Sequence, residues 1–199
     1  MDAIKNKGNI ILIVLYIFLI AFSKLMPHPA NFSPLLALAI FGGAMAYRKK
    51  SFILITLFAW YLSDFLYNNF VHSEYVTGKG GLVFFSGYMI WVYAGMLLVI
   101  LLASKLLHKF NYGRLFGTAL LSAVVFYLVT NFGAWLSMPE LYTRDIQGLM
   151  NSYVAAIPFF RATLLGNIVF SFLVFGLYEL IVKRFHVREP LFQVEKAKS

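Results

Sequence analysis

The predicted fold depends on residues 28–47, which read HPANFSPLLALAIFGGAMAY. Pro29 and Pro34 lack an N–H and push the residues before them out of the helical region, so the stretch begins as a stiff polar loop. It continues as an apolar helix in which small residues recur, at Ala39, Gly42, Gly43 and Ala46. This spacing lets helix backbones approach closely inside a membrane. We expect a rigid loop that covers a pocket, followed by a tightly packed helix.

The composition indicates an integral membrane protein. Hydrophobic residues make up 61% of the 199 and charged residues only 13%, whereas soluble domains carry about 25% charged residues. Cysteine is absent, which excludes thiolate catalysis, disulfides and Cys-based zinc sites. The net charge of +9 comes from short basic clusters between apolar runs. That pattern is typical of loops that meet lipid phosphates, and we expect no nucleic-acid partner.

The apolar runs predict an all-α bundle of six transmembrane helices. The runs cover residues 9–22, 34–47, 52–67, 82–103, 115–136 and 162–182. They form one domain over residues 1–184, which a polar tail follows at 185–199. The second run is shorter than the roughly 20 residues that cross a hydrocarbon core, so whether it fully spans stays open. Residues 146–156 are expected to form a short, separate interfacial helix.

Six crossings place both termini on one side of the membrane, and the basic residues indicate which side. Thirteen of the 17 Lys and Arg residues fall on the side of the termini. The other four are Lys24, Lys79, Arg144 and Arg161. Cytoplasmic loops carry an excess of Lys and Arg. Both termini are therefore expected in the cytoplasm.

Polar residues in several spans reach a similar depth near the outer side. Asp64 lies in the outer leaflet or at its edge, and Asn131 and Asn167 lie one to two turns from the outer ends of their spans. Such groups normally face a bundle interior or a water-filled cavity. We predict an outward-opening pocket for a small organic molecule. Its expected contacts are His28, Asn31, Phe32, Asp64, Tyr88, Trp91, Asn131, Trp135, Arg161 and Asn167.

Several of these residues also fit plainer roles. Tyr88, Trp91 and Trp135 are typical of the aromatic belt at a membrane surface. The two asparagines fit hydrogen bonds that join helices. Arg161 fits either an exposed end charge or the ionic partner of an acid in the third span. The small residues of the second helix fit plain helix packing.

Two other classes of function stay open. A non-catalytic assembly subunit would use its polar residues only to pair helices. A membrane-embedded enzyme would use Asp64 and His28 as acid and base, but the chain lacks a phosphate-binding loop or a nucleophile motif, so we expect no enzymatic activity. A metal site is also disfavoured, because the candidate ligands lack motif spacing, and no cofactor is expected. These candidate ligands are His28, His72, Asp64 and Glu74.

An ordered set of motifs resembles a known group of proteins. The motifs are HPANFSP at 28–34 with AIFGGA at 39–44, LSD at 62–64, TNFGAW at 130–135, and YVAAIPFFR at 153–161 with LLGN at 164–167. Together they resemble an uncharacterised bacterial membrane-protein family that is grouped with the S components of energy-coupling-factor vitamin transporters. The resemblance covers most of residues 27–176.

The resemblance implies a substrate-capture subunit of the bacterial inner membrane. Its six helices would hold a vitamin- or nucleobase-like solute under the loop between the first two helices. Transport would need a transmembrane coupling subunit and two ATPase subunits as partners. S components carry an Ala-x-x-x-Ala pattern on the first helix for docking, which Ile10–Ile20 lacks. Docking would then use Ala39, Gly43 and Ala46, or the protein would work without the coupling subunit.

Overall fold

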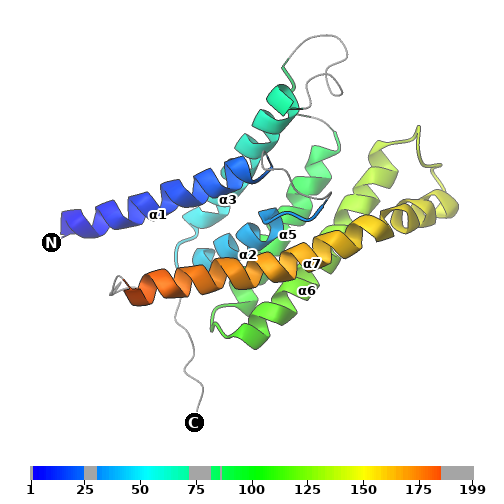
Figure 1. Ribbon diagram of the computed structural model, residues 1–199. Coiled ribbons are helices and arrows are strands. Elements are labelled where there is room, and N and C mark those ends of the chain that lie inside the picture. The colour runs from blue at the N-terminus through cyan, green and yellow to red at the C-terminus, as the bar shows by residue number, and fades with distance from the viewer. Residues whose placement is uncertain (1, 25–30, 72–81, 86, 185–199) are drawn as a thin grey trace.

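The computed structural model describes residues 2–24, 31–71, 82–85 and 87–184, and over these residues the regular structure is helical (Figure 1). The helices are α1 (Asp2–Ser23), α2 (Leu35–Ala46), α3 (Ser51–Leu66), α5 (Met89–Leu106), α6 (Tyr112–Ser137) and α7 (Ile146–Arg184). A π-helical turn, η1 (Tyr67–Val71), extends α3. The predicted all-α class is confirmed for this part of the chain.

Four segments are long and apolar enough to cross a membrane. They are Ser51–Val71, Met89–Leu106, Tyr112–Ser137 and Ile146–Arg184. The segment Ile13–Ser23 of α1 and the whole of α2 are apolar but shorter. These helices indicate a membrane protein.

The short helix α2 forms the centre of the bundle. All 12 of its residues are buried, and it contacts every other α-helix of the described chain (Figure 1). At 1.5 Å per residue it rises about 18 Å, less than the roughly 30 Å of a bilayer core. Because protein covers it on all sides, its backbone and side chains need no match to lipid.

Two glycines let α2 approach its neighbours. A Cβ atom added to Gly43 would overlap the Ile100 carbonyl oxygen of α5 and would lie 2.7 Å from the Ala103 Cβ. A Cβ on Gly42 would overlap the Tyr16 and Thr56 hydroxyls. Those hydroxyls lie 2.9 Å apart, and Tyr16 also donates to a carbonyl of α2 at 2.8 Å. The C-terminal half of α2 therefore packs directly against α1, α3 and α5, with no space left between the helices.

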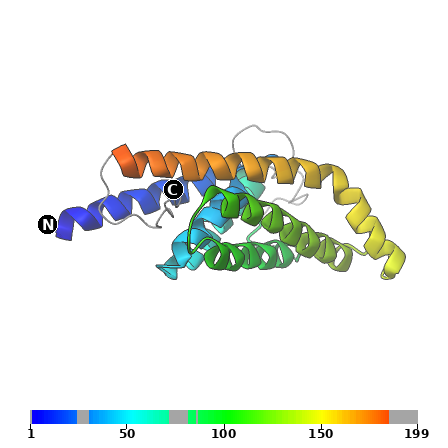
Figure 2. The ribbon, with the colours of Figure 1, turned by 90° about the horizontal axis from the view of Figure 1, so that it is seen from below.

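Helix α7 is longer than the sequence predicted. It runs without a break from Ile146 to Arg184, so the expectation of a separate interfacial helix at 146–156 is wrong. Pro158 lies inside it and removes one backbone hydrogen bond, a loss that bends a helix without always ending it. Figure 2 shows this bend between the yellow and the orange parts of α7.

Helix α5 begins later than predicted. The apolar run starts at residue 82, but the helix starts at Met89. The Asn69 side chain accepts from the Val83 N–H at 2.7 Å and donates to the Val83 carbonyl at 2.9 Å. Because both backbone groups of Val83 are taken by this side chain, residues 82–85 stay outside the helix.

The first and last described helices share one end of the bundle. Figures 1 and 2 both place the beginning of α1 and the C-terminal turn of α7 at the same end. Helix α1 runs away from that end, so the chain that enters α2 lies toward the opposite one. The candidate site lies there.

Candidate functional site

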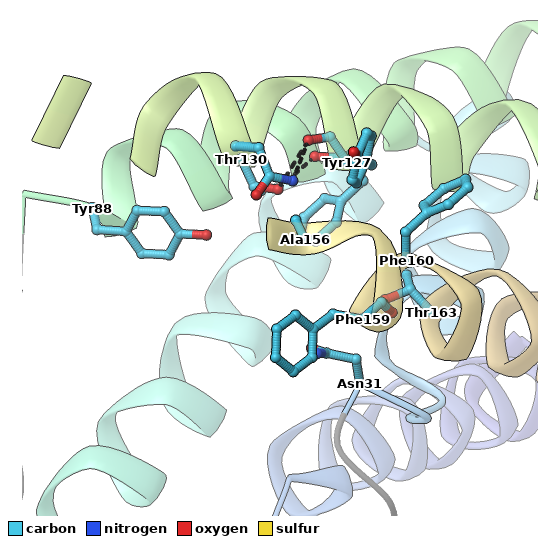
Figure 3. A pocket seen from close by; sticks show the side chains of 10 residues that line it. Asn31, Tyr88, Tyr127, Thr130, Ala156, Phe159, Phe160 and Thr163 are labelled. Carbon is cyan, nitrogen blue, oxygen red and sulfur yellow. Dashed lines mark hydrogen bonds between the residues drawn. The ribbon is translucent and has the colours of Figure 1, made fainter. Parts of the chain in front are cut away.

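A cavity of about 190 Å³ lies between α6 and α7, next to the chain that enters α2 and α5 (Figure 3). Each of the two long helices contributes four lining residues, and each of the two entering segments contributes one. The lining residues are Phe126, Tyr127, Thr130 and Asn131 from α6, Ala156, Phe159, Phe160 and Thr163 from α7, and Asn31 and Tyr88.

Helical spacing brings these side chains to one space. On α7, Phe159 and Phe160 lie three and four positions after Ala156, and Thr163 lies three or four positions after them, which places all four on one face of the helix around Pro158. The two helices are joined at the cavity wall, where the rings of Tyr127 and Phe160 lie 4.7 Å apart. The Tyr127 hydroxyl also donates to the Tyr153 carbonyl at 2.6 Å. Tyr127 therefore joins α6 to α7 at two points, before and after Pro158.

The mouth of the cavity is formed by two residues that precede helices. Asn31 has φ 61°, the one positive φ of a non-glycine residue in the described chain. Asparagine adopts this left-handed conformation more readily than most residues. Figure 3 shows Tyr88 reaching toward the space from the start of α5, with Asn31 at another side. Asn31 is exposed, so the cavity opens there.

Three of the ten predicted contacts line this cavity: Asn31, Tyr88 and Asn131. Asn131 donates to the Tyr127 carbonyl of its own helix at 2.8 Å, and so does not bond to a neighbouring helix through this group. His28, also predicted, lies outside the described residues.

Asp64 lies away from the cavity lining and is paired. Its carboxylate forms an ion pair with Lys24 and accepts from the Tyr93 hydroxyl at 2.9 Å. The Lys24 ammonium lies 5.7 Å from the centroid of the Trp60 ring. Asp64 is buried and Lys24 is partly exposed. The partner of Asp64 is thus Lys24, and Arg161, the alternative partner, is exposed.

The remaining predicted contacts pack helices and loops. The Phe32 ring lies 5.3 Å from that of Phe170. Trp91 fills the space beside Gly133, where a Cβ would overlap its ring. The Trp135 indole N–H donates to the Thr143 carbonyl at 2.8 Å.

Asn167 joins two helices. It is fully buried in α7, and its Nδ2 donates to the Ala119 carbonyl of α6 at 2.7 Å. This is the plainer role that its residue type suggested, and it places the side chain outside the cavity lining.

The predicted contact set lacked most of the aromatic wall and two threonines. The missing residues are Phe126, Tyr127, Thr130, Ala156, Phe159, Phe160 and Thr163. A signal for some of them is present in the sequence, because Tyr127 precedes Asn131 by one helical turn and shares its face. Phe159 and Phe160 follow Pro158, a position at which a bend in the helix is expected.

The described residues contain no cluster of side chains that could bind a metal ion. Among these residues no group of three or more His, Cys, Asp or Glu side chains could hold an ion. His28, His72 and Glu74, three of the four candidate ligands, lie outside the described residues.

Comparison with known proteins gives one match. A family model described as "Family of unknown function (DUF6580)" matches residues 4–191. No curated protein and no solved structure matches the chain. The match fits the expectation of an uncharacterised family, and it carries no information on S components.

Proposed function

Because the chain belongs to a family of unknown function (DUF6580), we propose a function from its own residues: capture of a small organic solute from the outer side of a membrane. The observation that carries the proposal is the cavity of about 190 Å³ whose wall combines aromatic rings with amide and hydroxyl groups. Binding sites for small molecules commonly combine an apolar wall with a few placed polar groups. Its volume is below the roughly 300–1,000 Å³ of typical ligand pockets, so the solute is small.

In this proposal all six helices contribute to a bundle in the bacterial inner membrane, with both termini in the cytoplasm. The shared end of α1 and α7 supports an even number of crossings (Figures 1 and 2). The loops that follow α2 and α5 are basic, as cytoplasmic loops are. Their basic residues are Arg48, Lys49, Lys50 and Lys109, and Lys105 and Arg114 lie in the helix turns that adjoin the second loop. The cavity then opens to the outside.

We further propose that the protein acts as an S component, with a coupling subunit and ATPase subunits as partners. Only the sequence resemblance supports this step. The burial of α2 argues against docking through Ala39, Gly43 and Ala46, because these residues pack inside the chain. A coupling subunit would therefore contact another helix, such as α1, where large apolar side chains are exposed.

The experiment that tests solute capture fills the cavity. Ala156 lines the cavity, whereas its neighbour Ala155 is exposed and does not line it. Ala156→Phe and Ala155→Phe therefore make the same chemical change on the same helix, one inside the cavity and one outside. Each protein is purified gently from its native membrane, and the molecules released on denaturation are identified by mass spectrometry.

We expect wild-type protein and Ala155→Phe to release one compound in near-stoichiometric amount, and Ala156→Phe to release none. Equal release from Ala156→Phe would show that the compound binds elsewhere and would contradict the proposal. Thermal unfolding of all three proteins checks that the loss is not a loss of folding. Co-purification of ATPase subunits, followed in the same preparations, tests the S-component role separately.

A non-catalytic assembly subunit is the second candidate. The hydrogen bond of Asn167 to α6 and the ion pair of Asp64 with Lys24 favour it, because both use polar side chains to join helices. In that case the cavity has no occupant. Wild-type protein would release no compound, and Ala156→Phe would raise the unfolding temperature by filling empty space.

A further inference from the structure

Three of the four hydroxyl groups of the cavity wall have already used their hydrogens. Thr130 and Thr163 each donate to the carbonyl four residues earlier in their own helix, at 2.8 and 3.0 Å. Tyr127 donates to the Tyr153 carbonyl at 2.6 Å. A hydroxyl has one hydrogen and two lone pairs. Toward an occupant, these three groups can therefore only accept.

The amide of Asn131 also has fewer donors than usual to offer an occupant. One hydrogen of its Nδ2 goes to the Tyr127 carbonyl at 2.8 Å, so its oxygen and a single N–H remain for an occupant. The other donors of the lining are the Asn31 amide, which lies at the open mouth, and the Tyr88 hydroxyl, which lies within hydrogen-bonding reach of Thr130. Deep in the cavity, acceptors outnumber donors.

Among the residues that the structure describes, the cavity lining also lacks a counter-ion. None of its ten lining residues carries a charge. Of the charged residues predicted as contacts, Asp64 is paired with Lys24 and Arg161 is exposed, and neither lines the cavity. A buried charge without a partner is costly in a membrane-embedded site. The wall therefore disfavours both anions and cations.

The shape of the wall is set by aromatic rings. Five of the ten lining residues are Phe or Tyr, and the rings of Tyr127 and Phe160 lie 4.7 Å apart at the junction of the two helices. Rings prefer offset stacking or edge-to-face contact with another flat group. A flat occupant makes the most of such a wall.

From this hydrogen-bond balance we propose that the cavity takes an uncharged, flat molecule whose edge carries N–H donors. The inference rests on the proposed solute capture and names the class of solute. Donors on the molecule meet the oxygens of Thr130, Asn131 and Thr163, and its faces meet the rings. Molecules with only acceptors at this edge leave those oxygens unpaired, which costs binding free energy.

Four probes of nearly one shape test this class: benzamide, benzamidinium, benzoate and acetophenone. The first three have the same size and differ in charge, and the fourth is uncharged but has no N–H. Their affinities for the purified full-length protein are measured by ligand-observed NMR titration at pH 7. We expect benzamide to bind at least tenfold tighter than each of the other three. Any other probe binding as tightly as benzamide overturns the inference.

Isosteric variants place the binding at the proposed atoms. Thr130→Val and Thr163→Val keep the shape and remove one acceptor each, and each should weaken benzamide binding about threefold to tenfold. Thr118→Val is the control, because Thr118 is buried in the same helix as Thr130 but does not line the cavity. Unchanged affinity in both cavity variants would contradict the assignment of the acceptors.

The two proposals fail in different ways. If the molecule released by wild-type protein and lost in Ala156→Phe proves to be an ion, or benzamide does not bind, the solute class is wrong and solute capture stands. If nothing is released and none of the four probes binds, both proposals fail together.

Discussion

Helix α2 meets two different surroundings along its 12 residues. Around Gly42 and Gly43 the bundle is closed, because the neighbouring chains occupy the space that a Cβ would need. Beyond its other end, next to Asn31, the bundle opens into the cavity between α6 and α7. Glycine closes the first region by letting backbones touch. The second region is lined by aromatic side chains of both helices, and Pro158 lies within its α7 wall. The chain thus separates a packing region, around Gly42 and Gly43, from the proposed binding region, which is the cavity.

The strongest way to break the closed region is Gly43→Ala. The new Cβ meets backbone atoms of α5, which cannot rotate away as a side chain can. We expect a loss of about 3 kcal/mol of unfolding free energy, the upper range for overpacking. Gly176→Ala is the control, since a Cβ there has nothing within 4 Å. Thermal unfolding in detergent measures both, and equal stability of the two variants would contradict the close approach.

Asp64 belongs with the packing region if its partner is Lys24. Asp64→Ala leaves the ammonium without its carboxylate, which we expect to cost about 2 kcal/mol because Lys24 is partly exposed. Solute release should not change, since Asp64 does not line the cavity. The double variant Lys24→Met, Asp64→Leu should recover most of the stability. A folded Asp64→Ala protein that has lost its solute would move this residue back into the binding region.

Tyr127 belongs to the wall of the cavity, at the point where α6 contacts α7. Tyr127→Phe removes the hydrogen bond to the Tyr153 carbonyl, and we expect a loss of about 1 kcal/mol of unfolding free energy. Tyr153→Phe removes a longer bond of 3.0 Å at an exposed position, so its effect should be smaller. Denaturant or thermal unfolding of the pair gives the comparison. A larger effect of Tyr153→Phe would show that the cavity wall is not held at Tyr127.

The smallest expected effect lies at the loop before α7, outside both regions. The Gly148 N–H and then the Thr143 hydroxyl bond to Asp145 and hold its pKa below the ordinary value. A lowered pKa means that the unfolded chain binds the proton more readily, so this stability is full above about pH 4 and is lost as the pH falls through the folded pKa. Unfolding temperatures from pH 6 to pH 3 should therefore fall less steeply in Asp145→Asn. Identical pH dependence of the unfolding temperature in the two proteins would contradict a stabilising role of these Asp145 hydrogen bonds.

Helix positions were largely predictable, because they follow from apolar runs. The run at 34–47 contains α2 (Leu35–Ala46), and the run at 115–136 lies within α6 (Tyr112–Ser137). The two errors have local causes that a hydropathy pattern does not carry. Pro158 bends α7 without ending it. The start of α5 is displaced because Asn69, 14 residues before Val83, takes its backbone groups.

The candidate site was less predictable than the fold. Counting residues gives the depth of a side chain along a helix, and Asn131, which was chosen in this way, lines the cavity. It does not give the neighbour that the side chain faces. Asn167 lies on a face that meets the Ala119 carbonyl, and Asp64 meets Lys24, which is 40 residues away in the sequence. Such partners depend on helix rotation and packing, which one sequence does not reveal.

The length of α2 also has a consequence for how the protein is made. A helix of 12 apolar residues is too short to partition into a bilayer as an independent span. Most transmembrane helices insert singly and then associate. Helix α2 is buried only when the other helices are packed around it. We therefore expect it to enter the membrane late, together with α1 and α3. Biogenesis of this protein would then depend on the insertion of α2 and α3 together as a helical hairpin, whose turn contains the basic residues 48–50.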